Sequence, residues 1–426
     1  MMLRKGSLLI TVFSLVVTLV GTFSARAANT VTLTVSTNVV GDSAKTLQSL
    51  MDKFTAANPD IKIDFSAPGK DYEAQMKVKM AANDMPDVFS THGWAKIRYG
   101  DFLMDLRDQP WASKIVAAMK PIVTDDAGKV YVLPFDQDKV GPVFNIDLFN
   151  QWGLKPPTTW DELLSVCDAI KTKSGGKVIP IHVGGADNWP LGHMLDLFSD
   201  QLLISPAKNQ AQALLDGTFD WSVYLPMAQK LLDLQQKGCL NPDATTAKYD
   251  DSAKAFASGK AAMGIYGPFI VQDALSINPN LHAGFIPVPA MVAGDTPTFT
   301  GGEKTTFGIW KDTKNKDAAL KLLNFLAQPE NVALVAKASG EPAGIEGVDV
   351  DLGQLTQWYN QYKDTRVLPY FDRVYLPNGM FDSLDKGAQD LLSGGVTPQQ
   401  YVDNLKAEYT RLHAAMAATP AATAAQ

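Results

Sequence analysis

Hydrophobic and polar residues alternate early in the chain, and the period then changes to that of a helix. Every second residue over 31–36 is apolar, which predicts a strand. Apolar residues at helical spacing over 44–54 predict a helix next. A second strand over 61–65, a second helix over 72–82 and a short strand over 87–90 repeat this order. The alternation predicts a parallel sheet covered by helices, and therefore an α/β fold.

The same alternation continues through the rest of the chain. Further strands are predicted over 130–134, 142–145, 178–183, 261–266, 285–289 and 307–310, and further helices from 158, over 191–203, over 223–237 and over 317–326. Thr159 and Glu162 have the spacing of a capping box at the start of one of these helices. The Ala- and Thr-rich segment 415–426 has little apolar surface to bury, which predicts a disordered tail.

Residues 1–27 have the pattern of a secretory signal peptide. The basic pair Arg4 and Lys5 precedes an apolar stretch over 8–20. That stretch is shorter than the ~20 residues that a membrane-spanning helix needs. Positions 25–27 read Ala-Arg-Ala, the small-residue pattern of a cleavage site. We expect export with cleavage behind this motif and no lipid anchor, because no Cys follows the apolar stretch; an uncleaved anchor helix is the alternative.

The composition is that of a folded, acidic protein. The chain has 426 residues, of which 46% are hydrophobic and 19% are charged. This length suggests two or three domains with sizeable cores, and the apolar fraction is too high for a disordered chain. The 38 Lys and Arg against 45 Asp and Glu give a formal net charge of −7. Nucleic acids and anionic membrane surfaces need clustered basic residues, so the acidic balance argues against both as partners.

Two cysteines are too few for a disulfide framework. Cys167 lies on the apolar face of a predicted helix, and Cys239 follows another helix. An exported protein could contain a bridge, but the sequence does not place the two side by side. We expect two buried free thiols that pack as small apolar residues, with a bridge as the alternative.

Catalytic signatures are absent from the sequence. It lacks the motifs of serine hydrolases, phosphate-binding loops, dinucleotide-binding folds, zinc proteases and thiol oxidoreductases. His182 and His193 are more typical of a strand His and a helix His than of a metal pair. Asp136 and Asp138 lie on one loop, whereas a glycosidase needs carboxylates on both sides of its substrate. We expect no enzyme, metal or cofactor; an exported carbohydrate-cleaving enzyme is the alternative.

Polar and aromatic residues gather in the loops that follow the predicted strands. Ligands of open α/β sheets bind beyond the carboxyl ends of the strands. Carboxylate and amide groups hydrogen-bond hydroxyl groups, and a Trp face packs against the apolar face of a sugar ring. We expect Trp94 and Trp189, which lie in such loops, to face a ligand, and Trp152, Trp160 and Trp310 to fill the core.

Nine short segments occur in an order and spacing shared with a known family. They are, in chain order, Phe54–Pro59, Met85–Val88, Tyr131–Pro134, Phe144–Phe149, Pro156–Leu163, Phe256–Met263, Gly267-Pro268, Gly301-Gly302 and Lys316–Ala319. Together they resemble the family 1 extracellular solute-binding proteins of ABC importers, the carbohydrate-binding group to which maltose-binding protein belongs. The resemblance covers nearly all of 28–410.

The resemblance implies a type II periplasmic binding protein fold. In this fold two α/β lobes enclose a ligand cleft, and the chain crosses between them three times, so that each lobe is discontinuous. We expect residues 28–140 and 287–330 in lobe one, and residues 141–286 and 331–414 in lobe two. Hinge bending closes the lobes around a ligand, and the closed form is recognised by the permease.

The family's cleft positions carry over loop by loop. The ligand-binding residues that the resemblance implies are Asn38, Asp42, His92, Trp94, Asp136, Gln137, Asp138, Trp189, Tyr266, Phe269, Gly302 and Glu303. Trp189 stands where family members place an aromatic platform for a sugar ring. Phe269 stands where Trp is common in the family, which leaves a smaller stacking surface.

The resemblance implies a monomeric periplasmic protein, without a cofactor, that binds a sugar or oligosaccharide and delivers it to ABC transporter permease subunits. Similar proteins bind glycerol phosphates, so a glycerol phosphate or another polyol is the alternative ligand. A phosphate would need Arg or Lys in the cleft loops, and only Arg366 and Arg373 are candidates. The sequence does not determine which sugar is bound.

Overall fold

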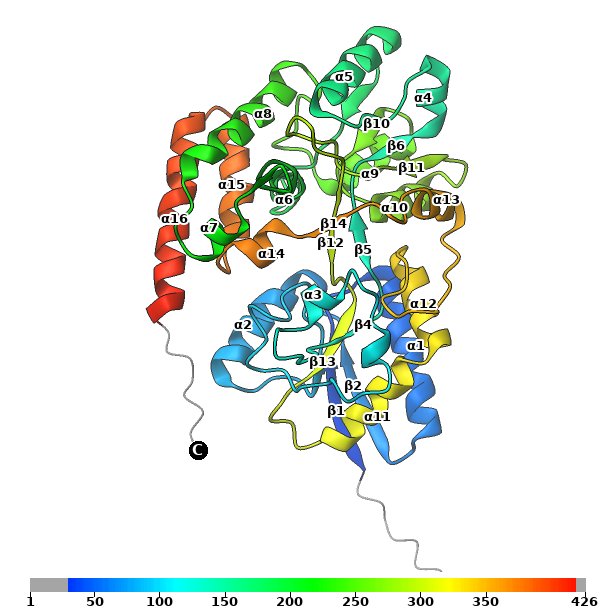
Figure 1. Ribbon diagram of the computed structural model, residues 1–426. Helices are drawn as coiled ribbons and strands as arrows, with labels where there is room; N and C mark the ends of the chain where they lie inside the picture. Colours follow the sequence, from blue (N-terminus) through cyan, green and yellow to red (C-terminus); the bar gives the residue numbers. More distant parts are fainter. Residues whose placement is uncertain (1–29, 419–426) are drawn as a thin grey trace, which may run out of the picture.

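The chain folds into two lobes joined by a small sheet, and Figure 1 shows one lobe above the other. The structure is a computed structural model that describes residues 30–418. The expected signal peptide lies outside this range. Within the range, none of the helices combines the length and the apolar character that crossing a membrane requires.

Lobe one is built on a five-stranded sheet. Its strand order is β2 (Ile61–Ser66), β1 (Val31–Ser36), β3 (Val88–Phe89), β13 (Thr306–Ile309) and β4 (Leu133–Pro134). Strand β1 is parallel to β2 and β3, whereas β13 is antiparallel to both of its neighbours. The helices of this lobe are α1 (Gly41–Ala57), α2 (Tyr72–Ala82), α3 (Lys120–Val123), α11 (Lys316–Leu326) and α12 (Pro329–Ser339). The parallel pairing predicted for the first three strands is confirmed.

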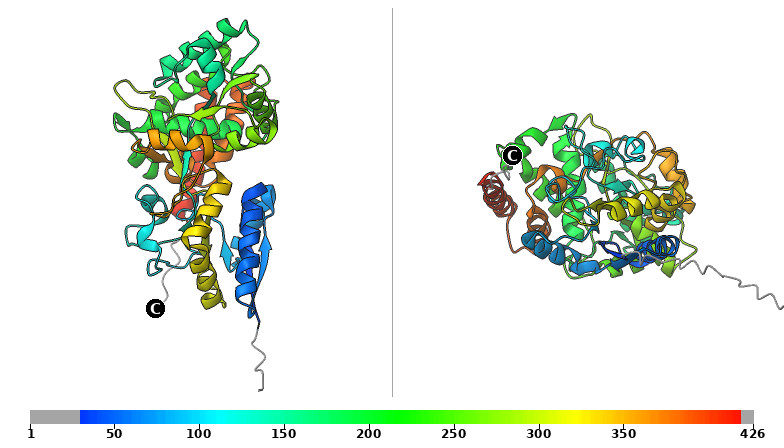
Figure 2. Two further views of the ribbon diagram at one scale, coloured as in Figure 1. Left: turned by 90° about the vertical axis from the view of Figure 1, so that its right-hand side faces the viewer. Right: turned by 90° about the horizontal axis from the view of Figure 1, so that it is seen from below.

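The apolar stripe of α1 explains how lobe one packs. Leu47, Leu50, Met51 and Phe54 recur at helical spacing, and all four are buried. Each such side chain contributes about 1.5–3 kcal/mol when it leaves water. The ring of Phe54 lies 5.5 Å from that of Phe325 on α11. Residues of α11 and α12 belong to the same core, and α12 lies side by side with α1 (Figure 2).

Lobe two contains a four-stranded mixed sheet and most of the helices. Its strand order is β11 (Ala283–Phe285), β6 (Val143–Asn145), β10 (Ala261–Gly264) and β7 (Ile179–Ile181), with β10 and β7 parallel and β6 antiparallel to both of its neighbours. A separate ribbon pairs β8 (Ile204–Ser205) with β9 (Lys208–Asn209). The helices are α4 (Ile146–Trp152), α5 (Trp160–Ser174), α6 (Pro190–Leu203), α7 (Ala211–Leu215), α8 (Leu225–Gln236), α9 (Tyr249–Ala257), α10 (Phe269–Ile277), α13 (Thr356–Gln361), α14 (Phe371–Tyr375), α15 (Met380–Leu392) and α16 (Pro398–Ala418).

The start of α5 shows the capping that its sequence suggests, shifted by one residue. The Thr159 side chain accepts the N–H of Glu162 at 3.2 Å. The Glu162 carboxylate accepts from the backbone N–H of Thr158 at 2.7 Å, one residue before the N-cap. Trp160, the first residue of the helix, is buried against Phe198, and Trp152 and Trp310 pack against the two cores, as predicted.

Three short strands connect the lobes. Strand β12 (Phe299–Gly302) lies between β14 (Val367–Pro369), to which it is parallel, and β5 (Asp138–Val140), to which it is antiparallel. Figure 1 shows β5 and β12 running from one lobe to the other. Because these strands are only three or four residues long, they join the lobes through few backbone hydrogen bonds, which suits a hinge.

The lobe boundaries differ from those expected from the sequence. Val332, Val335 and Ala336 of α12 belong to the core of lobe one, so that this lobe continues to about residue 345 instead of ending at 330. Val288 packs in the core of lobe two, so the segment 287–298 belongs there. Helix α12 belongs to lobe one because its apolar face packs against α1 and α11.

The C-terminal boundary also needs correction. Helix α16 continues to Ala418, whereas the tail was expected to begin at 415. Residues 415–418 are therefore helical, because they extend a helix whose earlier turns pack through Tyr401 and Tyr409. Residues 419–426 lie outside the described range.

Candidate functional site

A small cavity lies where both lobes meet the connecting strands. Gly93 and Ile122 of lobe one, Gly302 of β12, and Tyr370 and Arg373 of lobe two are among its lining residues. Its volume is ≈ 10 Å³, about enough for one water molecule. A larger solute therefore needs the lobes to move apart.

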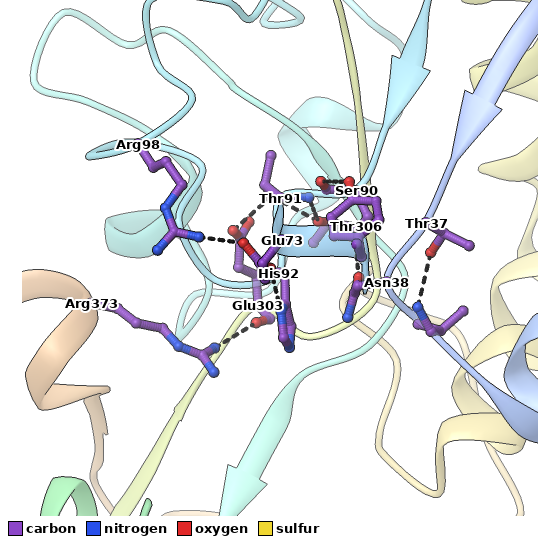
Figure 3. A network of polar contacts seen from close by, with 12 residues as sticks. Thr37, Asn38, Glu73, Ser90, Thr91, His92, Arg98, Glu303, Thr306 and Arg373 are labelled. Carbon is purple, nitrogen blue, oxygen red and sulfur yellow. Dashed lines mark hydrogen bonds and ion pairs between the residues drawn. The ribbon is translucent and has the colours of Figure 1, made fainter. Parts of the chain in front are cut away.

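The lobe-one wall is organised by Glu73 (Figure 3). Its carboxylate accepts from His92 Nδ1 at 2.9 Å and pairs with Arg98 Nη1 at 2.5 Å. Burial raises the pKa of Glu73, but the contacts with His92 and Arg98 outweigh it and leave the pKa below its usual value. His92 has a φ of 50°, an uncommon left-handed conformation for a residue other than glycine.

Trp94 lies between two guanidinium groups. Arg98 is 3.8 Å from the centre of its ring, and Arg373 of lobe two is 4.9 Å from it. The His92 ring meets it edge-on at 5.3 Å. Trp94 therefore lies at the junction of the two lobes, with guanidinium groups against its ring.

Arg373 crosses the cavity from α14. Its guanidinium lies 3.9 Å from the Tyr370 ring, and its Nη1 donates to the backbone carbonyl of Glu303 at 3.4 Å. A Cβ at Gly93 would lie 2.1 Å from Nη1, so a larger residue at this position would displace the guanidinium from where it lies. Arg98 makes a second interlobe contact, donating from Nη2 to Asn378 Oδ1 at 2.7 Å. These contacts hold the two lobes together.

Glu303 is completely buried and held by lobe one. Its Oε1 accepts from Thr91 Oγ1 at 2.7 Å and from the N–H of Ala95 at 2.9 Å. Burial raises the pKa of Glu303 to about 7, against the two hydrogen bonds, which favour the ionised form. Its carbonyl, rather than its carboxylate, contacts Arg373.

Buried charges gather around the connecting strands. Lys304 Nζ lies 3.4 Å from Oε1 of Glu341, and the other carboxylate oxygen of Glu341, Oε2, accepts from the Tyr359 hydroxyl at 2.6 Å. Asp136 accepts from the N–H of Thr305 at 2.8 Å, and burial raises its pKa despite the nearby Lys304. Asp138, on β5, accepts from the Tyr370 hydroxyl.

The lobe-two wall is a cluster of aromatic rings. Trp189, at the start of α6, lies 5.1 Å from Tyr249, 5.7 Å from Tyr266 and 6.0 Å from Phe269. Trp189 and Phe269 are only partly buried, so each keeps surface for a ligand. Tyr266 is buried, and its hydroxyl accepts from the N–H of Gly184 at 2.8 Å, so it supports the cluster from behind.

His193 connects this aromatic wall to the cavity. Its ring lies 6.3 Å from Phe269 and 6.1 Å from Tyr370, which stacks under Arg373. Burial lowers the pKa of His193 to about 4, so the imidazole is neutral near pH 7. The aromatic surface is therefore continuous from Trp189 to the junction with lobe one.

Of the twelve predicted site residues, Gly302 and Glu303 are among the residues that line the cavity, and the other ten are not. Asp42 is on the first turn of α1, where its side chain is 82% exposed and pairs with Lys45 at 2.9 Å. Asn38 accepts from Ser90 Oγ at 2.6 Å within lobe one, and Gln137 is bound through its backbone N–H to the carbonyl of Pro342. The structure brings the other predicted residues to the connecting strands and the two walls.

Sequence reasoning missed several members of the site, among them Glu73, Arg98, Tyr370, Lys304 and Glu341. Glu73 looks like an ordinary surface residue of a helix, and Arg98 and Tyr370 follow no strand pattern. Arg373 was considered only as a possible phosphate ligand, although it contacts two aromatic rings and a carbonyl. Among the described residues, no group of three or more His, Cys, Asp or Glu could hold a metal ion.

The family comparison agrees with this architecture. The sequence model of the family of bacterial extracellular solute-binding proteins matches residues 40–333, which is more than half of the chain. The chain belongs to this family. Its two lobes and connecting strands form the type II solute-binding fold that the sequence predicts.

Individual members of the family resemble the chain over nearly their whole length. The melibiose/raffinose/stachyose-binding protein MelE of Bacillus subtilis is 38% identical over 383 residues, which cover 89% of this chain and 90% of MelE. A Bacillus licheniformis sugar transporter, solved in complex with stachyose, is 42% identical with a TM-score of 0.83, covering 90% of this chain and 100% of that one. A putative Bacillus subtilis binding protein in an open conformation is 37% identical with a TM-score of 0.86, covering 91% and 99%. These relatives are transport components, and no catalytic family is indicated.

Proposed function

We propose that this protein is the substrate-binding component of an ABC importer and binds an oligosaccharide with a terminal α-galactosyl unit. Melibiose, raffinose and stachyose, for which MelE is named, share an α-(1→6)-linked galactosyl unit, and stachyose occupies the solved relative at 42% identity. This chain offers the same class of ligand an aromatic wall on lobe two and buried carboxylates at the connecting strands. Closure of the lobes around the sugar then presents the protein to the permease.

The unpartnered carboxylate oxygens carry this proposal. Within the described part of the chain, Asp136 Oδ2, Asp138 Oδ1 and Glu303 Oε2 are buried and make no hydrogen bond. A buried acceptor without a partner is costly, whereas sugar hydroxyls supply several donors in a small space. The partly exposed faces of Trp189 and Phe269 suit the apolar C–H face of a pyranose ring.

A glycerol phosphate fits these residues less well. Arg373 lines the cavity, but Tyr370 and the Glu303 carbonyl already engage its guanidinium. Arg366, the other cation considered from the sequence, lies 3.5 Å from Asp295. The buried carboxylate of Asp138 would repel a phosphate dianion, while a neutral sugar pays no such electrostatic cost.

Calorimetric titration distinguishes these ligands. We expect heats of binding for melibiose, raffinose and stachyose, none for glycerol 3-phosphate, and weaker or no binding of maltose, which lacks galactose. Chromatography of the sugar after long incubation should show no cleavage, as a transport component requires. Binding of glycerol 3-phosphate alone, or consumption of raffinose, would contradict the proposal.

The proposal includes export to the periplasm, a monomeric state and docking to permease subunits. The family is extracellular, and positions 25–27 carry the expected cleavage motif. The intact mass of protein from a periplasmic extract should correspond to a chain that begins at Ala28. A mass that includes residues 1–27 would show that the motif is not used.

A further inference from the structure

The two cysteines lie in the core of lobe two, away from the cleft. Cys167 is on α5 and Cys239 is in the turn after α8; both are completely buried and belong to one apolar cluster. They are free thiols in the structure. The proposed sugar-binding mechanism uses neither of them.

The backbone on both sides brings these residues together. Lys171, one helical turn after Cys167, donates from Nζ to the carbonyl of Lys237. A Cβ at Gly238 would lie 3.6 Å from Cδ of the same lysine. The carbonyl of Cys239 accepts from the N–H of Ile181 in β7, the strand on which α5 packs. The turn before and at Cys239 is thus fixed against the face of α5 that carries Cys167.

The two side chains lie in the same core on neighbouring elements, and the proximity of Cys239 together with burial raises the pKa of the Cys167 thiol. Two thiols on elements that packing already holds side by side need little backbone movement to bond. No other cysteine of the chain competes for either one, since the sequence has only two.

We propose that Cys167 and Cys239 form a disulfide in the exported protein, joining α5 to the end of α8. The proposal rests on export to an oxidising compartment, where structural disulfides persist. Both thiols are free and buried in the structure, as the sequence predicts, and the proposal takes up the alternative of a bridge because two residues 72 positions apart in the chain pack in one core.

The chemistry requires an oxidant, which we take to be a disulfide, either of an exported thiol oxidase or of oxidised glutathione. One cysteine thiolate attacks a sulfur of that disulfide, forming a mixed disulfide and releasing one oxidant thiol. The second cysteine attacks the mixed disulfide, so that the Cys167–Cys239 bond forms and the second oxidant thiol leaves. The two cysteines lose two protons and two electrons in total, and the oxidant gains them. Since both sulfur atoms are inaccessible in the folded lobe, this exchange takes place while lobe two is still folding.

Mass spectrometry after alkylation tests the proposal on the whole chain. Protein from the periplasmic extract is unfolded in denaturant with iodoacetamide and no reductant. We expect no alkylated cysteine, a mass about 2 Da below that of the reduced chain, and one cross-linked peptide pair containing Cys167 and Cys239. Two alkylated cysteines would overturn the proposal for the exported protein.

A refolding experiment tests whether the folded chain can form the bridge, independently of export. Reduced protein is unfolded and refolded either with oxidised and reduced glutathione or with dithiothreitol, and the Tm values of the two products are compared. We expect the bridge to raise Tm by about 5–10 °C, because it closes a long loop in the unfolded chain. The Cys167→Ala/Cys239→Ala variant is the control, and its Tm should not respond to dithiothreitol. If refolding leaves both thiols free, the geometry does not support the bridge, whatever sugar the protein binds.

Discussion

Replacing Lys304 with methionine is expected to lower the free energy of unfolding by about 2–3 kcal/mol. The substitution leaves the completely buried carboxylate of Glu341 without its cation, and it removes a positive charge from the neighbourhood of Asp136 and Asp138. Removing one member of a buried pair generally costs more, about 3–5 kcal/mol. The lower value takes into account that the Lys304 side chain is 25% exposed and that Glu341 can take up a proton. Denaturant titration of the ligand-free protein measures the loss.

Two further variants make this result specific to the pair. Lys314→Met changes an exposed lysine ten residues later and should alter stability by less than about 0.5 kcal/mol. The double variant Lys304→Met/Glu341→Gln should lose less stability than the sum of the two single variants, because it leaves no unpaired carboxylate at position 341. If Lys304→Met unfolds like Lys314→Met, the buried pair does not stabilise the hinge region.

Trp189→Ala is expected to weaken binding of raffinose or stachyose at least tenfold. The Trp189 ring is the partly exposed end of the aromatic wall, and stacking on a sugar contributes on the order of 1 kcal/mol beyond the area that it buries. Together with the lost contact area this exceeds the 1.4 kcal/mol that corresponds to a factor of ten. Calorimetric titration of parent and variant gives the ratio directly.

Trp160→Ala is the matched control for this experiment. Trp160 is only 5% exposed and packs edge-on against Phe198 at 5.6 Å in the core of lobe two. Its removal should cost about 3–5 kcal/mol of stability and leave the affinity of the folded fraction nearly unchanged. Trp189→Ala should destabilise less, because the ring is partly exposed and loses contacts only within the aromatic cluster. Unchanged affinity combined with a large loss of stability in Trp189→Ala would show that Trp189 is a core residue.

Local pattern predicted the elements that are long enough to show a period. The apolar residues of α1 and the alternation in β1 and β2 are visible in the sequence because each element buries one face. Helix α2 begins and ends as predicted. The sequence did not predict the connecting strands β5, β12 and β14, since segments of three or four residues are too short to show the period of a strand or of a helix. The motif order shared with the family, rather than periodicity, predicted that two lobes would be present.

The sequence by itself determined the α/β class, the family and the strand-end loops that carry Trp94 and Trp189. It could do so because these features depend on residues that are close together in the chain. Only the tertiary structure decided that α12 belongs to lobe one and that Glu73 orients His92 and Arg98. It also decided that Arg373 reaches Trp94 across the cleft and that Cys167 and Cys239 share one core. Each of these arrangements joins residues that are distant in the chain. Their partners are selected by burial and charge in the folded protein, and no local sequence pattern encodes these.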